Sequence, residues 1–304
     1  MSDEKKKKSQ KSKFRIYAEF IPFWCLYKIM RIMNLHLAYF LSRQLFKVMY
    51  LLDCRHRTRA IAHLQHAGVA HNTDDARRMA KESYMNFSML LAEIFKLDQL
   101  IKPGMVKVVG SEATIREACK TDGGNINLIV VTAHYGNWEL AGSCWAREFK
   151  IPMVSVFRRF ANPLIGDYIL RSRQSDVHKS VPKDGGIKGM LKALREGKTV
   201  AILADQHANA KEGVETVFFG QPCRTHGSPA LLHLKTGVPI VPQLTRRVGN
   251  NFNFEFVVGD MIRYTPTDDK EKDVQNIAQM YTSALEKMIA EAPTQWMWSH
   301  RRWL

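Results

Sequence analysis

The chain of 304 residues lacks the marks of a disulfide-bonded or membrane-spanning protein. Its five cysteines are odd in number and form no Cys-x-x-Cys pair, which excludes a disulfide framework and a zinc ribbon. It has no stretch of about 20 uncharged apolar residues, so we expect no simple transmembrane helix. The hydrophobic region near the amino terminus carries too many charges for a signal peptide and has no small-residue cleavage site. The hydrophobic content of 45% excludes a disordered chain, and the length suits one large domain or one domain with an appended segment.

Several common catalytic and cofactor-binding motifs are absent as well. The chain contains no Gly-x-Ser-x-Gly nucleophile elbow, no P-loop, no Gly-x-Gly-x-x-Gly fingerprint and no His-Glu-x-x-His zinc motif. Its eleven histidines are scattered without the spacing of metal ligands. We therefore predict a functional site that uses neither a metal nor a cofactor.

Acidic residues are scarce near the amino terminus. Residues 1–60 contain fourteen Lys and Arg but only four Asp and Glu, whereas the whole chain has a formal charge of +16. Because the excess charge belongs to a terminal region, it argues against a nucleic-acid-binding domain. We expect residues 1–13 to form a disordered polybasic tail, which would be attracted to anionic lipid if it lay beside a membrane.

Residues 14–52 combine many aliphatic and aromatic side chains with charges spaced along the segment. This pattern predicts amphipathic or shallowly inserted helices at a membrane surface, with aromatic and basic residues at the interface. The alternative is ordinary packing of these helices onto the domain formed by residues 53–304.

Within residues 53–304, strand-like and helical patterns alternate. Strands are predicted at 106–109, 128–132, 153–157, 199–203, 238–244 and 252–258. Helices are predicted at 55–100, 111–121, 138–148, 163–175, 186–196, 228–236 and 271–291. Within the first range, Thr73 or Asp74 is expected to cap the helical segment that begins there. The alternation predicts an α/β fold with a mixed, largely parallel sheet flanked by helices.

The most informative segment is 133–142. The apolar strand before it would deliver His134 to its C-terminal end, where a Gly136-Asn137 turn would lead into a helix with Glu139 in its first turn. This bend would let the Glu139 carboxylate reach the imidazole, which a single helix would not, because residues five apart on a helix lie about 140° apart. A carboxylate partner fixes the tautomer and raises the basicity of His134, giving a general base for a hydroxyl. The alternative is that His134 has no catalytic role, because a His near a Glu in the sequence is common.

Two further regions contain candidate functional residues. Asp205 follows the strand at 199–203, where α/β folds usually place ligands, although a solvated turn acid would fit the same position. Residues 293–303 are aromatic and basic, and are expected either to pack over the domain as a lid or to touch interfacial lipid.

Basic and amide side chains follow the strand at 153–157. Arg158 and Asn162 precede a helix that carries Arg171. Arginines near a strand end can bind phosphates in a bidentate manner, whereas for any single arginine a surface salt bridge is the competing interpretation.

Taken in order, these segments resemble the bacterial lipid A biosynthesis acyltransferases, the lauroyl/myristoyl transferase family within the lysophospholipid acyltransferase-like superfamily. The resemblance covers nearly the whole chain. Its landmarks, after the basic hydrophobic amino terminus, are His134-Tyr-Gly-Asn-Trp-Glu139, Arg158-x-x-x-Asn162-Pro163, Ala204-Asp205-Gln206, Phe218-Phe219-Gly220, Pro229-Ala-Leu-Leu232 and Trp296-x-Trp298-x-His300-Arg-Arg-Trp303. The His-x4-acid element is shared by the wider glycerolipid acyltransferases, but the ordered set is specific.

The resemblance implies a glycerolipid acyltransferase-like fold and a catalytic dyad of His134 and Glu139. It also implies functional importance for Arg171 and Asp205. Family members face the cytoplasm at the inner membrane and transfer an acyl chain from acyl carrier protein to a hydroxyl of an acylated glucosamine lipid. The expected partners are therefore acyl carrier protein, anionic membrane lipid and an acylated glycolipid, with no nucleic acid and no cofactor.

For such a reaction, the expected oxyanion donors are the backbone N–H groups of Gly136 and Asn137 or the guanidinium of Arg171. Arg158 and Asn162 are the further expected substrate-binding residues. The charged segment at 14–52 favours peripheral or shallow membrane attachment.

Alternative functions remain open at the level of the sequence. The acceptor could be a lysophospholipid or another glycolipid, and the donor could be acyl-CoA. A rival from a different class is a non-catalytic polybasic protein that binds membrane surfaces or nucleic acid, against which the terminal position of the charge argues.

Overall fold

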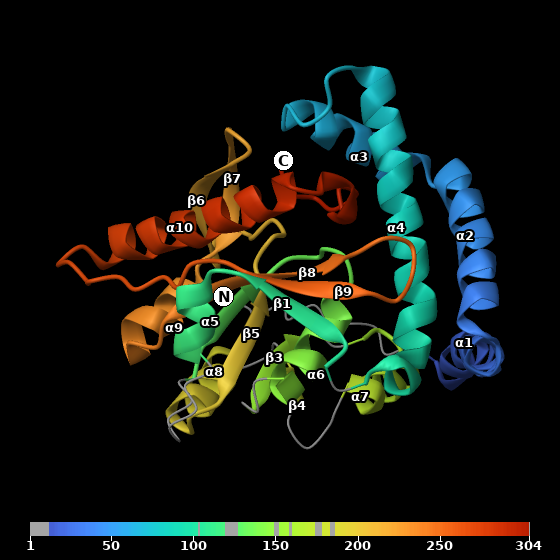
Figure 1. Ribbon diagram of the computed structural model, residues 1–304, viewed down its shortest axis with the longest axis horizontal. Coiled ribbons are helices and arrows are strands. Elements are labelled where there is room, and N and C mark those ends of the chain that lie inside the picture. Colours follow the sequence, from blue (N-terminus) through green and yellow to red (C-terminus); the bar gives the residue numbers. More distant parts are fainter. Residues whose placement is uncertain are drawn as a thin grey trace, which may run out of the picture.

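The protein is built around one seven-stranded sheet (Figure 1). A computed structural model describes residues 12–102, 104–118, 127–148, 152–157, 160–173, 178–182 and 186–303. The strand order is β1-β9-β8-β2-β5-β3-β4, and neighbouring strands are parallel except for the antiparallel pair β8–β9. The strands are β1 (Val106–Gly110), β2 (Ile129–Thr132), β3 (Met153–Phe157), β4 (His178–Pro182), β5 (Thr199–Leu203), β8 (Ile240–Arg247) and β9 (Phe254–Val258). The predicted α/β fold with a mixed, largely parallel sheet is confirmed.

Helices flank the sheet, and the first two of them form an arm that packs on the fourth. They are α1 (Lys13–Ile32), α2 (Leu35–Leu52), α3 (Cys54–His66), α4 (Thr73–Leu100), α5 (Glu112–Ala118), α6 (Trp138–Glu148), α7 (Pro163–Arg173), α8 (Gly186–Arg195), α9 (Ser228–Thr236), α10 (Lys270–Ala290) and the 3-10 turn η1 (Pro293–Gln295). The predicted helix at 55–100 is interrupted near Gly68, whose φ of 64° belongs to the left-handed region. The cap of α4 is Asn72, not Thr73 or Asp74, because the Asn72 side chain accepts the backbone N–H of Asp75.

Two features of the sheet region were absent from the sequence prediction. One is β4, a short edge strand whose sequence, His-Lys-Ser-Val-Pro, has no apolar run. The other is the hairpin of β6 (Gly213–Phe218) and β7 (Gln221–His226), which forms a separate two-stranded sheet. Its turn residues Phe219 and Gly220 both have positive φ, 52° and 69°. Such a turn usually carries Asn-Gly or Asp-Gly, so the Phe at its first central position concealed it.

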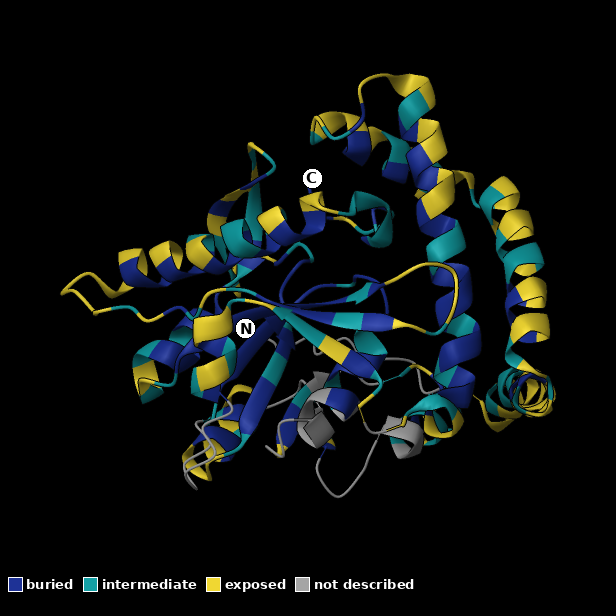
Figure 2. Cartoon of the chain, viewed as in Figure 1, coloured by how far each residue is buried: buried dark blue, intermediate teal, exposed yellow. Residues whose placement is uncertain are grey.

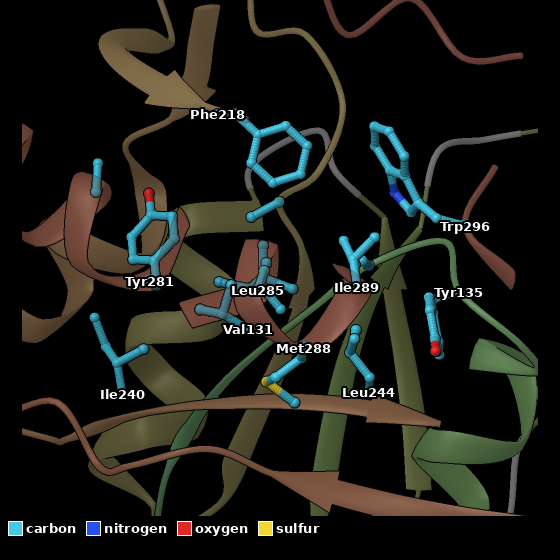
Figure 3. Packing of buried hydrophobic residues seen from close by; sticks show 14 of the residues in the cluster. Val131, Tyr135, Phe218, Ile240, Leu244, Tyr281, Leu285, Met288, Ile289 and Trp296 are labelled. Carbon is cyan, nitrogen blue, oxygen red and sulfur yellow. The ribbon is translucent and has the colours of Figure 1, made fainter. Parts of the chain in front are cut away.

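Alternate residues of β2 face two separate cores. Ile129 and Val131 pack with side chains of α8, α9 and α10 in one cluster, seen from close by in Figure 3. Leu128, just before the strand, and Val130 pack with α6 and β9 in the other. This period of two, with both faces apolar, is expected of a parallel strand that helices cover on both sides.

The arm of α1 and α2 packs against α4 through one face (Figure 1). Tyr27 and Tyr39 are buried there against a cluster that includes Phe95. The Lys96 ammonium caps the end of α1 by donating to the carbonyls of Met30, Arg31 and Met33 at 3.2, 2.8 and 2.8 Å. Packing against the domain therefore accounts for one face of this arm.

The other face of the arm is exposed (Figure 2) and rich in apolar side chains. Of the nineteen large hydrophobic residues that are exposed in the described part of the chain, fifteen lie on α1 and α2. Among the described residues, no helix has both the length and the hydropathy needed to cross a membrane. The predicted polybasic tail, residues 1–13, lies almost wholly outside the described residues.

Candidate active site

The site lies where β2 and β5 end side by side. The two strands are parallel, and their register pairs Thr132 with Leu203. His134 and Asp205 each follow two residues later, so the pairing brings them to the same edge of the sheet. The Asp205 carboxylate accepts the backbone N–H of His134 at 2.8 Å and contacts Nδ1 of its ring at 2.9 Å.

The Asp205 carboxylate has a third hydrogen-bond donor. The indole Nε1 of Trp296 donates to it at 2.9 Å, and Asp205 is only 3% exposed. Burial alone would raise the pKa of Asp205, but attraction to His134 and the hydrogen bonds from it outweigh burial and hold the pKa well below its usual range. Asp205 is therefore ionised at neutral pH.

This ionised partner determines which nitrogen of His134 can act as a base. Because a carboxylate has no proton to give, Nδ1 of His134 donates to Asp205, and the neutral ring has its lone pair on Nε2. The amide Nε2 of Gln206 lies 3.3 Å from this nitrogen and 3.4 Å from Nε2 of His300. The Gln206 amide is also 3.4 Å from Nδ1 of His134, so it lies against the imidazole ring, next to His300.

Glu139 lies in the first turn of α6, as the sequence predicts. Its carboxylate accepts the indole N–H of Trp138 at 3.1 Å, and the Trp138 ring packs edge-on against His134 with centroids 5.0 Å apart. The carboxylate hydrogen-bonded to Nδ1 of His134 is Asp205, which the register of two strands brings there from 71 residues away. A dyad role for Glu139 stays a prediction.

The Gly136-Asn137 turn is held by backbone contacts. Gly136 has a φ of 53°, and a Cβ at this position would lie 2.0 Å from the carbonyl oxygen of Thr245, so only glycine fits. Its N–H donates to the Gln295 carbonyl at 3.0 Å, and the N–H of Asn137 donates to the Thr245 carbonyl at 3.3 Å. The two N–H groups that the sequence suggested for an oxyanion instead hold the turn to β8 and η1.

The remaining predicted site residues lie around α7. Asn162 is buried; its side chain caps α7 and donates to the Ile16 carbonyl and the Glu19 carboxylate, at 2.9 and 3.1 Å. This ties α7 to α1, and substrate contact by Asn162 stays a prediction. Arg171 lies near the end of α7. Arg158 lies outside the described residues.

The carboxyl-terminal segment packs over the site, which confirms the first of its two expected placements. Trp296, Trp298 and Trp303 are buried, and Trp296 lies near Tyr135 in Figure 3. The N–H of Met297 donates to the His134 carbonyl at 3.1 Å. Arg302 is buried with its guanidinium over the Phe218 ring, and donates to the Thr225 hydroxyl at 2.8 Å.

His300 joins the site without having been singled out from the sequence. Its ring centroid lies 4.6 Å from that of His134. Burial, and next the nearby charge of His134, lower the pKa of His300 to about 4, so it is neutral at physiological pH. The sequence offered only indirect signals for these residues. Trp296 and His300 belong to the aromatic, basic carboxyl terminus, and Gln206 belongs to the Ala204-Asp205-Gln206 segment. Within the described residues, no group of three or more His, Cys, Asp or Glu is placed to hold a metal ion.

Comparison with known proteins assigns the chain to a family. A family model described as bacterial lipid A biosynthesis acyltransferase matches residues 5–304. The chain belongs to this family. The resemblance based on its ordered motifs is thereby confirmed.

Curated relatives of this family member act on different lipids, according to their names. The lipid A biosynthesis lauroyltransferase of Escherichia coli K12 is 30% identical over 58% of this chain and 55% of its own length. The phosphatidylinositol mannoside acyltransferase of Mycobacterium tuberculosis H37Rv is 25% identical over 59% of this chain and 55% of its own length. The palmitoleoyltransferase of E. coli is 24% identical over 76% of this chain and 73% of its own length. The chain thus spans about half the length of the first two relatives.

Replacing His300 with Gln should flatten the pH dependence of stability below neutrality. In the unfolded chain His300 takes up a proton near its ordinary pKa of 6.5, whereas the folded protein resists protonation until about pH 4. The folded state therefore loses stability as the pH falls through this window, by up to about 3 kcal/mol from this residue. Urea unfolding between pH 4 and pH 8 measures this slope.

The exposed His71 offers a matched control for this measurement. The variant His71→Gln should keep the slope of the unsubstituted protein, whereas His300→Gln should be distinctly flatter. Parallel slopes for all three proteins would show that His300 is not held neutral by the fold.

Proposed function

We propose that this protein is a membrane-associated acyltransferase. It moves a fatty acyl chain from a thioester, carried by acyl carrier protein or coenzyme A, to a hydroxyl of a lipid A precursor. The observation that carries the proposal is the Asp205–His134 pair, which leaves Nε2 of His134 unprotonated. Membership of the lipid A acyltransferase family, and the names of the E. coli relatives, support the reaction and the acceptor.

His134 acts as general base in this mechanism. Its Nε2 removes the proton of the acceptor hydroxyl as the oxygen attacks the thioester carbonyl carbon. Asp205 stabilises the imidazolium that forms, in the way that the acid of a hydrolytic triad does. Glu139, which accepts the indole N–H of Trp138 beside His134, supports the same charge. The tetrahedral intermediate then expels the thiolate, which takes the proton from Nε2 and leaves as a thiol.

The oxyanion of that intermediate requires donors near Nε2 of His134. The Gln206 amide is already 3.3 Å from this nitrogen and has two N–H groups to offer. Arg171, on α7, is the second candidate donor, as expected from the family resemblance. The backbone N–H groups of Gly136 and Asn137 support the geometry of the turn instead.

A second acceptor class is favoured by one observation. The M. tuberculosis relative is named for phosphatidylinositol mannoside, a glycolipid of another kind. Acylation of a different glycolipid or of a lysophospholipid uses the same base and donor, so the two candidates differ only in the acceptor. Parallel assays with a lipid A precursor and with lyso-lipids separate them.

Membrane attachment is proposed to occur through the exposed face of α1 and α2, at the cytoplasmic side of the inner membrane. Fifteen exposed large apolar residues are distributed along both helices, and the basic residues at 1–13 precede them in the sequence. Burial of apolar side chains and attraction to anionic lipid would act together there. The basic surface also suits an acidic carrier protein as donor.

Replacing His134 with Ala should lower kcat by about a thousandfold, and Asp205→Asn by about a hundredfold or more, because general-base catalysis contributes on this scale. The matched control is Asp273→Asn. Asp273 is also a buried carboxylate with three donors, namely the Tyr264 hydroxyl and the N–H and hydroxyl of Thr267, but it lies at the start of α10. Turnover is measured as transfer of radiolabelled acyl chain per folded molecule.

The control should lose stability and keep its kcat. Near-normal turnover by folded His134→Ala protein would contradict the mechanism. An equal loss of kcat in Asp273→Asn would mean that the effect at Asp205 is only structural.

The double substitution Ile32→Glu with Leu52→Glu should weaken membrane binding at least tenfold. These side chains are 86% and 78% exposed on the arm, and burying one large apolar side chain contributes roughly 1.5–3 kcal/mol. Co-sedimentation with vesicles of phosphatidylethanolamine and phosphatidylglycerol measures the loss.

Val217→Glu is the matched control, because Val217 is an exposed apolar residue on the β6–β7 hairpin. It should sediment like the unsubstituted protein. Unchanged sedimentation of the double variant would exclude this face as the membrane contact.

A further inference from the structure

A second buried carboxylate contacts the Gly136-Asn137 turn. Glu93 of α4 forms a bidentate ion pair with Arg247 at the end of β8, with N–O distances of 2.6 and 2.7 Å. The two side chains are 0% and 2% exposed. Removing two charges from water costs several kcal/mol for each ion, and the attraction between them compensates only when the remaining bonding positions are also filled.

Those positions are filled from two further segments. The Glu93 carboxylate accepts the Tyr39 hydroxyl of α2, and at 2.8 Å the amide of Asn137. Burial first, and then the charge of Glu93, raise the pKa of Tyr39, which keeps its hydroxyl a donor. The guanidinium of Arg247 also lies over the Phe254 ring, 4.6 Å from its centroid. One carboxylate thus joins α2, α4, β8 and the turn.

Asn137 connects this ion pair to the catalytic residues. Its side-chain oxygen accepts the N–H of Leu140 at 3.0 Å and so caps α6, while its amide N–H group donates to Glu93. It is three residues from His134. The direction of the Asn137 side chain, and with it the start of α6, therefore depends on where Glu93 holds this amide, in addition to the backbone hydrogen bonds of the turn.

Arg247 holds the other half of the turn through Gln295. The Gln295 side chain bonds both backbone groups of Arg247, at 2.8 and 2.9 Å. The Gln295 carbonyl in turn accepts the N–H of Gly136 at 3.0 Å. The ion pair thus reaches the Gly136-Asn137 turn through the Asn137 side chain, whereas the backbone of Arg247 reaches it through Gln295.

We propose that Glu93 and Arg247 are positioning residues of the active site, which hold the turn after His134 and so fix its imidazole relative to substrate. The proposal rests on the proposed function. A buried ion pair adds little stability compared with apolar side chains of the same size, but it fixes direction. Misplacement of a catalytic group by about 1 Å can cost a hundredfold in rate. An ion pair that fixes the turn after His134 would therefore support the rate of the reaction.

The decisive variant removes both charges together. Glu93→Leu with Arg247→Met leaves no unpaired buried charge, so the protein is expected to fold. Its melting temperature should be lower, because the Tyr39 hydroxyl and the Asn137 amide stay buried without their acceptor. Asn137 then loses its acceptor. We expect kcat per folded molecule to fall at least tenfold, with KM within twofold, because substrate contacts are unchanged.

Two single substitutions that disturb the Glu93 contacts less should cause smaller losses of kcat. Glu93→Gln keeps an oxygen that can accept the Asn137 amide, so it should recover part of the kcat that the double variant loses. Tyr39→Phe removes one of the hydrogen bonds to the carboxylate, keeps the volume of the ring, and should lower kcat by about threefold. Tyr39→Phe also keeps the test decisive if the charge variants do not fold.

Asp273→Asn again serves as control, since it disturbs a buried carboxylate away from the turn. A role in stability alone would lower the melting temperature of all variants and leave kcat per folded molecule unchanged, which would overturn the proposal. If His134→Ala turns over normally, the proposed function itself fails. If His134→Ala is inactive while the Glu93 and Tyr39 variants keep full kcat, only the positioning proposal fails.

Discussion

The ionised carboxylate of Asp205 is the constraint on which the site depends. It is buried, and it accepts three N–H groups that come from the end of β2 and from the carboxyl-terminal segment. A buried charge of this kind is stable only while its donors stay in place. The tautomer of His134, the position of Trp296 and the packing of the last residues over the sheet are therefore linked to one another.

A second buried carboxylate, Glu93, holds the Gly136-Asn137 turn, which follows His134. Asp205 orients the His134 imidazole directly, whereas Glu93 holds Asn137, which is three residues after His134 in the chain. Through Tyr39 the same carboxylate contacts α2, whose outer face is apolar and exposed. The proposed membrane-binding arm and the proposed general base are thus parts of one hydrogen-bonded scaffold.

The sequence was informative wherever the signal was local. The strand at 128–132, the Gly136-Asn137 turn and the helix from Trp138 follow from apolar runs and turn residues, and the structure contains them at those positions. The pairing of His134 with Asp205 depends on the register of β2 with β5, across 71 residues, and Glu93 reaches Arg247 across 154. No local pattern encodes such contacts. The β6–β7 hairpin was missed for a different reason, because Phe219 occupies a turn position that usually holds Asn or Asp.

The tautomer of His134 tests the central claim most directly. Nitrogen-15 NMR of histidine-labelled protein, with His134→Gln to assign the resonances, reports which ring nitrogen carries the proton when the ring is neutral. The account predicts a proton on Nδ1 and a lone pair on Nε2, with this preference lost in Asp205→Asn. A proton on Nε2 in the unsubstituted protein would contradict it, because the nitrogen proposed as the base would then have no lone pair to accept a proton.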